Sequence, residues 1–361
     1  MTTLTFAHQP ATPTEASERA AVLANPGFGT RFTDHMVTAI WTTDRGWHDA
    51  ELRAYAPLSL EPAAAVLHYA QAIFEGLKAY RHADGSVWAF RPQANAARFQ
   101  ASARRLALPL LEVQDFVAAI DALVSADQAW VPDAPETSLY LRPFMFASEA
   151  FLGVRPAHEV TFCLIASPAG PYFATGVAGV SIWLSTDYSR AAPGGTGAAK
   201  CAGNYAASLC AQQQAAEHGC QQVVFLDAVE RTWVEELGGM NLFFVHADGT
   251  LVTPELTGTI LEGITRSSIL TLAAEQGLDV VERKVSIDEW RQAAASGEIR
   301  EVFACGTAAV VTPVARLAWD GGEVVISQGK PGPVTLGIRS ALVDLQYGRV
   351  ADRHAWMHRI C

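Results

Sequence analysis

Strand-like and helix-like segments alternate along this 361-residue chain, and that alternation limits the folds open to it. Because a helix does not follow every strand, the pattern predicts an α/β fold other than a simple doubly wound sheet. Strand patterns, some with turns, cover 34–57, 86–90, 138–146, 159–167, 180–185, 222–227, 241–246, 280–285, 301–305 and 323–327. Helical spacing covers 94–108, 115–126, 203–218, 265–276, 287–295 and 334–346.

The length predicts two domains, since one ordinary core seldom extends over so many residues. Proline and glycine interrupt the segment 167–179, which is typical of a connection between domains. We therefore expect a small N-terminal α/β domain at 1–170, a connection at 171–182 and a large C-terminal domain at 183–361.

The composition excludes several partners. A net charge of −11 argues against nucleic acid and against anionic membranes, both of which require a basic surface. No apolar stretch reaches the length of a membrane span, and Glu15 and Glu18 are unlike a transit peptide. These features predict a cytoplasmic protein. Charged residues make up only 17% of the chain, which indicates a large buried interior or a sizeable subunit interface.

Cysteine and histidine spacing gives little sign of a metal. The six cysteines are scattered without a C-x-x-C pair, so neither a disulfide framework nor a zinc site is expected. His354 and His358 would share one face of a helix, but the sequence offers them no third ligand. We predict no metal. Cys201 is expected to be a packing residue, with a reactive role as the alternative.

Lys200 is the first candidate for chemistry. It ends the small-residue run 193–200, and Cys201 is the only other ionisable residue between Arg190 and Tyr205. Desolvation in such a loop lowers a lysine pKa, and a neutral lysine amine forms imines with carbonyl compounds. The alternative interpretation is a solvated lysine in a flexible loop.

A second candidate is the strand 138–144. Its period of two places Tyr140, Arg142 and Phe144 on one face. An arginine between aromatic side chains suits a pocket that recognises a carboxylate, with a structural pair at a sheet edge as the alternative.

Three further segments have weaker signals. The acidic pair 235–236 enters a glycine-lined turn and either faces a buried cation or is exposed. Segment 261–266 opens a helix whose free backbone N–H groups would suit an anion, and 305–309 ends a strand with similarly exposed N–H groups. An ordinary capped terminus is the alternative interpretation of both segments. A Walker A loop is excluded because Ala199 precedes Lys200, and no segment supplies the dinucleotide fingerprint G-x-G-x-x-G.

Taken together, these segments resemble the branched-chain amino-acid aminotransferases, pyridoxal-phosphate enzymes of fold type IV. The matches occur in the family's order and spacing from about residue 30 to 347, so they cover nearly the whole chain. They are 74–80 (FEGLKAY), 90–92 (FRP), 140–143 (YLRP), 170–172 (GPY), 200–205 (KCAGNY), 236–241 (ELGGMN) and 306–308 (GTA).

The resemblance implies two α/β domains of α+β type, with pyridoxal 5′-phosphate in the cleft between them and its lysine in the C-terminal domain. Lys200 would be catalytic, holding the cofactor covalently and moving a proton between the substrate Cα and the cofactor. Glu236 would keep the pyridine nitrogen protonated. The other implied cofactor-binding residues are Tyr205 at the phenolic oxygen, with Arg98, Ile264, Thr265 and Thr307 around the phosphate.

Substrate residues also follow from the resemblance. Phe74 and Tyr172 would hold a branched side chain, and Thr307 and Ala308 would bind the substrate carboxylate. The side-chain carboxylate of glutamate would be bound by Tyr69, Tyr140 and Arg142. Tyr69, Leu152 and Val154 would reach in from a neighbouring subunit, which implies a homodimer.

The implied activity is reversible ping-pong amino transfer between leucine, isoleucine or valine and 2-oxoglutarate, in biosynthesis or breakdown. It yields branched 2-oxo acids and glutamate. D-Amino-acid aminotransferases and aminodeoxychorismate lyases share the lysine and the glutamate, but segments 74–78 and 140–142 and the long N-terminal portion favour the branched-chain group. A non-catalytic dimeric binding protein is the other alternative, and the intact Lys200, Tyr205 and Glu236 argue against it.

Overall fold

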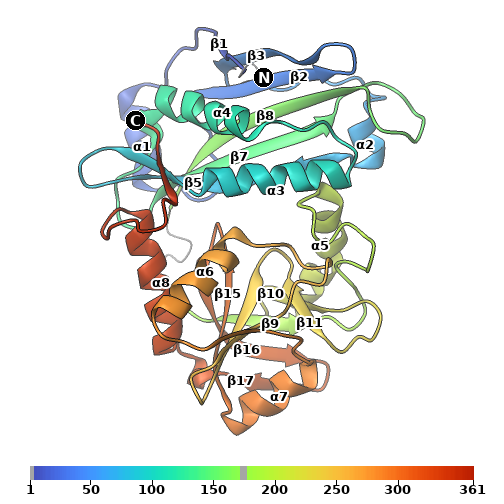
Figure 1. Ribbon diagram of the computed structural model, residues 1–361, viewed down its shortest axis with the longest axis vertical. Helices are drawn as coiled ribbons and strands as arrows, with labels where there is room; N and C mark the ends of the chain where they lie inside the picture. Colours follow the sequence, from blue (N-terminus) through green and yellow to red (C-terminus); the bar gives the residue numbers. More distant parts are fainter. Residues whose placement is uncertain (1–3, 171–176) are drawn as a thin grey trace. The chain divides into compact units, whose positions relative to one another are not determined.

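The computed structural model describes residues 4–170 and 177–361, which fold as two compact units (Figure 1). The first unit holds the described residues up to 170 together with Ala199–Ala202 and Leu345–Cys361. The second holds 177–198 and Gly203–Asp344.

This division departs from the expected boundaries in two places. Segment Ala199–Ala202, with Lys200, belongs to the first unit, because Cys201 forms a β-bridge with Ile73 and the Phe74 N–H donates to the Lys200 carbonyl oxygen at 3.0 Å. The C-terminal segment also belongs there, because its last strand pairs with β6.

The first unit is built on one sheet. Its strand order is β1-β3-β2-β8-β7-β5-β6-β18, with β4 beside β7, and every pairing except β1 with β3 is antiparallel. The strands are β1 (Ala7–His8), β2 (His35–Thr42), β3 (Gly46–Ala54), β4 (Ala72–Phe74), β5 (Leu77–Arg81), β6 (Val87–Phe90), β7 (Ser138–Ala147), β8 (Glu159–Ala169) and β18 (Met357–Arg359). The helices are α1 (Ala16–Ala24), α2 (Ala65–Tyr69), α3 (Pro92–Arg105), α4 (Val113–Ala126) and the 3-10 turn η1 (Gln128–Trp130).

Helices α3 and α4 cover one face of this sheet and enclose its core (Figure 1). Strand β7 shows how the sequence pattern sorts its two faces. Leu139, Leu141 and Met145 are fully buried in the core, whereas Tyr140 and Arg142 alternate with them and are only partly buried. The predicted period of two is confirmed.

The second unit is built on a mixed sheet. Its order is β11-β10-β9-β16-β15-β12-β13-β14, with β17 beside β16, and β9 runs parallel to both β10 and β16. The strands are β9 (Val180–Leu184), β10 (Gln222–Leu226), β11 (Val234–Leu237), β12 (Asn241–His246), β13 (Leu251–Thr253), β14 (Val280–Glu282), β15 (Ile299–Gly306), β16 (Val310–Trp319) and β17 (Gly322–Val325). The helices are α5 (Ala202–Glu217), α6 (Ile264–Glu275), α7 (Ile287–Ser296), α8 (Pro333–Gln346) and the 3-10 turn η2 (Ser327–Gly329).

The predicted α/β class is confirmed, and each helix predicted from its spacing is present within two to three residues of its expected ends. Several strands were not predicted, among them β13, β16 and β18. The prediction that His354 and His358 share one face of a helix is wrong. His358 lies in β18, and its Nε2 lies 2.8 Å from Asp121 Oδ1.

Within residues 4–170 and 177–361, no group of three or more potential metal ligands is found. All six cysteines have free thiols. No helix in these ranges is both long enough and apolar enough to span a membrane.

Candidate active site

Lys200 is held against the first unit by backbone contacts on both sides. Its N–H donates to Ser102 Oγ on α3 at 2.9 Å, and its carbonyl oxygen accepts from Phe74. Its Nζ lies 4.9 Å from the centroid of the Phe74 ring. Burial lowers the pKa of Lys200 to about 8, and the nearby Arg98 lowers it too, whereas Glu75 opposes the shift. The neutral amine is therefore more accessible at Lys200 than at an ordinary surface lysine.

Glu75 supplies the negative charge in this cluster. It has no exposed surface, and its carboxylate accepts from Arg98 Nε at 2.8 Å and from Arg98 Nη2 at 2.9 Å. Asn95 on α3 donates a third hydrogen bond at 2.7 Å. Burial alone would raise the pKa of Glu75, but the ion pair with Arg98 holds that pKa below its ordinary value. Arg98, predicted to bind phosphate, is thus fixed in orientation by a buried carboxylate.

Arg142 also lies close to the Phe74 ring. Its guanidinium carbon is 4.7 Å from the Phe74 centroid, and its Nη2 donates to the Tyr140 hydroxyl at 3.0 Å. Arg142 Nε is buried and has no hydrogen-bond partner among the described residues. A cavity of about 380 Å³ adjoins this pair and is lined by Phe28, Gly29, Phe32, Tyr140, Arg142, Ile165, Ala166 and Ser167.

Glycine is required beside this cavity. A Cβ atom on Gly76 would lie 2.1 Å from the Tyr140 hydroxyl oxygen, so any other residue would displace that tyrosine. The geometry suits a pocket for an organic carboxylate, as the sequence predicted.

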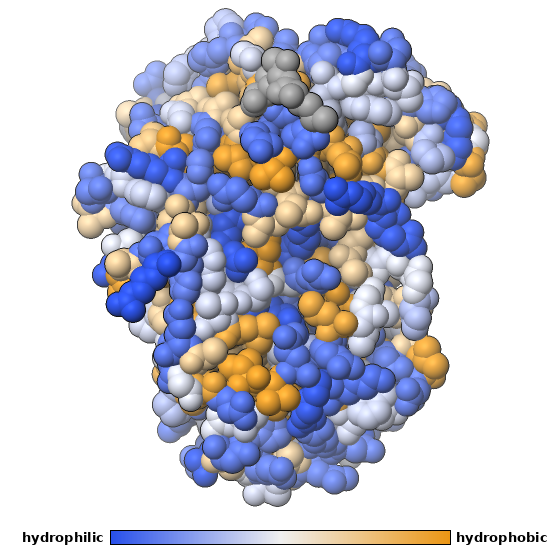
Figure 2. Space-filling model, viewed as in Figure 1, coloured by the Kyte–Doolittle hydropathy of each residue, from blue (hydrophilic) through white to orange (hydrophobic). Residues whose placement is uncertain are grey.

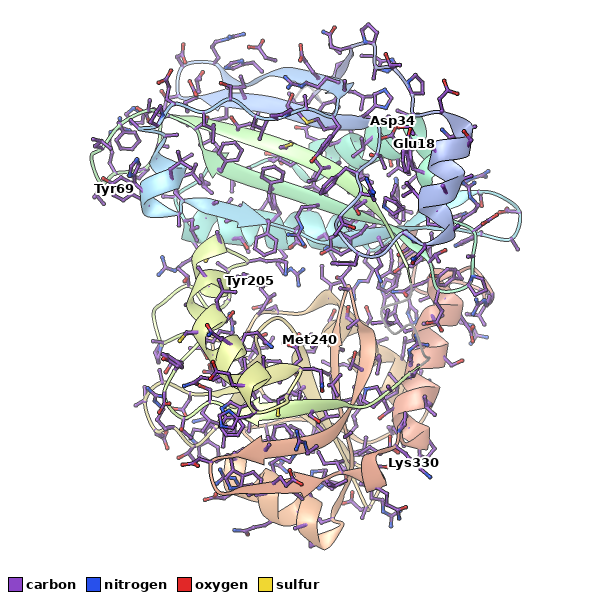
Figure 3. All side chains as sticks on the ribbon, turned by 180° about the vertical axis from the view of Figure 1, so that it is seen from behind. Glu18, Asp34, Tyr69, Tyr205, Met240 and Lys330 are labelled. Carbon is purple, nitrogen blue, oxygen red and sulfur yellow. The ribbon has the colours of Figure 1, made fainter. Side chains whose placement is uncertain are left out.

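Three predicted substrate residues lie apart from this cluster. Tyr69 ends α2, and its hydroxyl donates to the Leu152 carbonyl oxygen at 2.5 Å (Figure 3). Leu152 and Val154 are 67% and 87% exposed, in the connection between β7 and β8. Tyr172, which was also predicted to bind substrate, lies outside the described residues.

In the second unit, Glu236 on β11 is buried and pairs with Arg190. The same Arg190 nitrogen, Nη2, donates to the carbonyl oxygens of Gly197 at 2.9 Å and Thr259 at 3.0 Å. The Leu261 N–H also donates to Glu236, at 2.8 Å. Arg190 is therefore the buried cation that one interpretation of the acidic pair required.

The other predicted residues of this unit lie at the ends of elements. Ile264 and Thr265 begin α6, whose N-cap, Gly263, provides no side-chain cap. A Cβ atom on Gly263 would lie 2.0 Å from Asn241 Oδ1, so the approach to the helix requires glycine. Thr307 and Ala308 form the turn after β15.

Tyr205 lies in the first part of α5, and Figure 3 shows it together with Met240, which precedes β12. A Cβ atom on Gly239 would come within 3.7 Å of the Tyr205 ring, so this turn and the tyrosine lie close together.

Two residues with evident roles were missed by sequence reasoning. Glu75 stood inside the segment 74–80, but nothing in that segment indicated that its carboxylate would be fully buried beside Arg98. Arg190 lies 46 residues before Glu236 in the sequence, so only the fold pairs them. The signal available for Arg190 was its position as the last cation before the charge-poor segment that ends at Lys200.

Comparisons with known proteins define the class. The family described as amino-transferase class IV matches residues 72–317. A probable branched-chain-amino-acid aminotransferase of Streptomyces coelicolor is 60% identical over 362 residues, covering 100% of both chains.

Two solved structures are also similar. The branched-chain amino acid aminotransferase of Escherichia coli has a TM-score of 0.75 at 30% identity, covering 90% of this chain and 99% of its own. The branched-chain amino acid aminotransferase of Thermobaculum terrenum, solved in its PLP-bound holo-form, has a TM-score of 0.72 at 25% identity, covering 90% and 98%.

The chain therefore belongs to the class IV aminotransferases, a family of fold type IV that uses pyridoxal 5′-phosphate. Its place within that family is among the branched-chain-amino-acid aminotransferases.

The described residues fit this cofactor. Lys200 offers an amine with a lowered pKa to an aldehyde, and Arg98 offers a fixed guanidinium to a phosphate. Glu236 offers a buried carboxylate, and α6 begins without a side-chain cap, which leaves its start suited to an anion.

The charges around Lys200 predict how cofactor binding depends on pH. Only the neutral amine attacks an aldehyde, so the rate at which the apoprotein binds pyridoxal 5′-phosphate should rise as the pH passes through about 8. Glu75→Gln removes the charge that favours the ammonium form, so the midpoint should move to lower pH. Stopped-flow recording of the visible absorbance across pH measures both midpoints.

Glu301→Gln is the matched control, because Glu301 is also a buried glutamate but caps α8 in the second unit. Its midpoint should equal that of the wild type. An unchanged midpoint in Glu75→Gln would contradict the role given to Glu75.

Proposed function

We propose that this protein transfers amino groups reversibly between branched-chain L-amino acids and 2-oxoglutarate, with Lys200 as its catalytic residue. One observation carries the proposal: the Lys200 amine and the Arg142 guanidinium lie over the same aromatic ring, 4.9 Å and 4.7 Å from the Phe74 centroid. A proton-transferring group and a carboxylate-binding group thus both lie against one apolar side chain.

When bound, pyridoxal 5′-phosphate supplies an electron sink for the charge that develops at the substrate Cα. Lys200 would take the proton from the substrate Cα and deliver it to C4′ of the cofactor, and the first of these steps requires the neutral amine that burial favours. Glu236, oriented by Arg190 and the Leu261 N–H, holds a proton at the pyridine nitrogen.

The remaining roles follow the same assignment. The cofactor phosphate would be bound by Arg98, by the start of α6 at Ile264 and Thr265, and by Thr307. Tyr205 would donate a hydrogen bond to the phenolic oxygen of the cofactor. The N–H groups of Thr307 and Ala308 receive the substrate carboxylate.

Substrate selection divides between apolar and charged groups. Phe74 and Tyr172 hold the branched side chain of the first substrate. Arg142, with Tyr140 and with Tyr69 of a partner subunit, binds the side-chain carboxylate of glutamate or 2-oxoglutarate. Support comes from the buried Arg142 Nε, which no described residue accepts from and which an incoming carboxylate would satisfy.

We also propose that two copies assemble through the surface formed by Leu67, Tyr69, Leu152 and Val154. These side chains are 59%, 41%, 67% and 87% exposed. Hydrophobic surface is visible on the side of the first unit where α2 lies (Figure 2). An apolar cluster of this kind is characteristic of an interface. A cytoplasmic location stays a prediction from the sequence.

A spectroscopic titration tests both half-reactions. The visible absorbance of the purified holoenzyme should bleach on addition of L-leucine and return on addition of 2-oxoglutarate. Lys200→Ala should reduce turnover at least ~10²–10⁴-fold, because a positioned acid–base group is lost.

Lys330→Ala, which removes an exposed lysine, is the control for that variant and should leave turnover unchanged (Figure 3). Bleaching by D-alanine but not by L-leucine would overturn the branched-chain assignment. Turnover by Lys200→Ala at the wild-type level would overturn the role of the lysine.

Arg142→Met separates the two substrates. It removes a charged hydrogen bond to the side-chain carboxylate, worth about 1.5–3 kcal/mol, so the KM for 2-oxoglutarate should rise roughly 10–100-fold. The KM for L-leucine should change little. Steady-state kinetics with each substrate varied in turn measure the difference, and Arg316→Met, at the exposed Arg316–Glu323 pair, is the control. Equal rises for both substrates would argue against a carboxylate subsite at Arg142.

Val154→Asp tests the proposed interface. A carboxylate buried in an apolar contact should weaken self-association at least roughly tenfold. Analytical ultracentrifugation over a concentration series measures it. Val350→Asp alters a side chain that is 51% exposed elsewhere in the first unit and should leave association unchanged. The interface is misplaced if the two variants behave alike.

A further inference from the structure

The second unit contains a cavity to which the proposed reaction assigns no role. It encloses about 220 Å³ beside β11. Trp233, Glu235, Pro254, Ile260 and Lys284 are among the residues that line it. Glu236, next to Glu235 in the same strand, is not among the residues that line it.

Two buried polar atoms on the residues that line the cavity lack hydrogen-bond partners within the described part of the chain. Glu235 is 4% exposed; its Oε1 accepts from the Thr259 hydroxyl, but its Oε2 accepts from no described residue. Trp233 Nε1 is likewise buried and donates to none of them. Buried donors and acceptors are nearly always satisfied in proteins, so a partner is expected. Burial raises the pKa of Glu235, although the hydrogen bond from Thr259 and the charge of Arg190 act in the opposite direction.

The charges on the wall indicate what kind of partner fits. Glu230, Glu255 and Asp227 add three carboxylates, but both oxygens of Asp227 are already used by backbone N–H groups of its own turn. Among the described lining residues the one cation is Lys284, whose Nζ lies 5.1 Å from the Trp233 ring centroid. The remaining wall is largely apolar. A ligand should therefore have both a positive and a negative group and a short apolar body.

We propose that this cavity is a second binding site, distinct from the catalytic residues, for a small α-amino acid. Its ammonium group donates to Glu235 Oε2. Its carboxylate lies against Lys284 and accepts from Trp233 Nε1, and its side chain packs against Pro254 and Ile260. The volume is below the ~300–1,000 Å³ of ordinary ligand pockets, which limits the ligand to a small molecule. Binding here does not depend on the function proposed above.

Isothermal titration calorimetry of the holoenzyme with N-methyl-L-leucine tests the site. This probe keeps both charges and the branched side chain, but its secondary amine is not a substrate for amino-group transfer. Wild-type protein should bind one equivalent per chain at this cavity, in addition to any equivalent that the substrate pocket takes up. Glu235→Gln should weaken this binding roughly 10–100-fold through loss of a charged hydrogen bond, and Lys284→Met should weaken it about tenfold.

Lys284 is exposed, so Lys284→Met keeps the test valid even if Glu235→Gln folds poorly. Glu301→Gln should bind the probe as the wild type does. Absence of binding at millimolar concentrations, or binding unchanged in both Glu235→Gln and Lys284→Met, would overturn the proposal. Either failure is distinct from failure of the proposed reaction, which the L-leucine titration measures separately.

Discussion

The chemistry of the first unit depends on the buried carboxylate of Glu75. Lys200, Arg98 and Arg142 bring three cationic groups close together, and Glu75 supplies the balancing charge. Without it, Arg98 would lose its fixed orientation and the Lys200 pKa would fall further. Breaking a buried ion pair typically costs about 3–5 kcal/mol, because the remaining charge stays buried without a partner. Loss of either partner alone should therefore destabilise the unit as well as change its electrostatics.

In the second unit, two adjacent glutamates have different surroundings. Glu236 accepts from Arg190 and a backbone N–H, whereas Glu235 accepts only from Thr259 among the described residues. Thr259 connects them, because its hydroxyl donates to Glu235 and its carbonyl oxygen accepts from Arg190. The two carboxylates are thus connected by hydrogen bonds through Thr259 and Arg190.

Much of the fold could be predicted from local patterns in the sequence. The alternation in 138–146 identified β7 and placed Tyr140 and Arg142 on one face, because strand periodicity is a local property. Strand β16 was missed: its sequence is apolar without clear alternation, since most of it is buried on both faces. His354 and His358 match helical spacing, but the pairing of β18 with β6 outweighs that local pattern.

The candidate site was predictable in its residue types and less so in its partners. The charge-poor segment before Lys200 correctly indicated a lowered pKa. The pairs Glu75–Arg98 and Arg190–Glu236 could not be read from the sequence, because they join residues 23 and 46 positions apart whose meeting is decided by tertiary packing. The sequence also could not show that Ala199–Ala202 belongs to the first unit, because that depends on the β-bridge between Cys201 and Ile73.

The composition of the first unit from three separate stretches has a consequence for how the protein is made. Its sheet gains β18 from Met357–Arg359. Lys200 belongs to the short segment Ala199–Ala202, which residues of the second unit flank on both sides in the sequence. A ribosome synthesises β18 after the other strands of this sheet. The first unit therefore cannot complete its sheet until Met357–Arg359 have been synthesised, whereas the contacts of Lys200 with Phe74 and Ser102 involve residues that precede it in the chain.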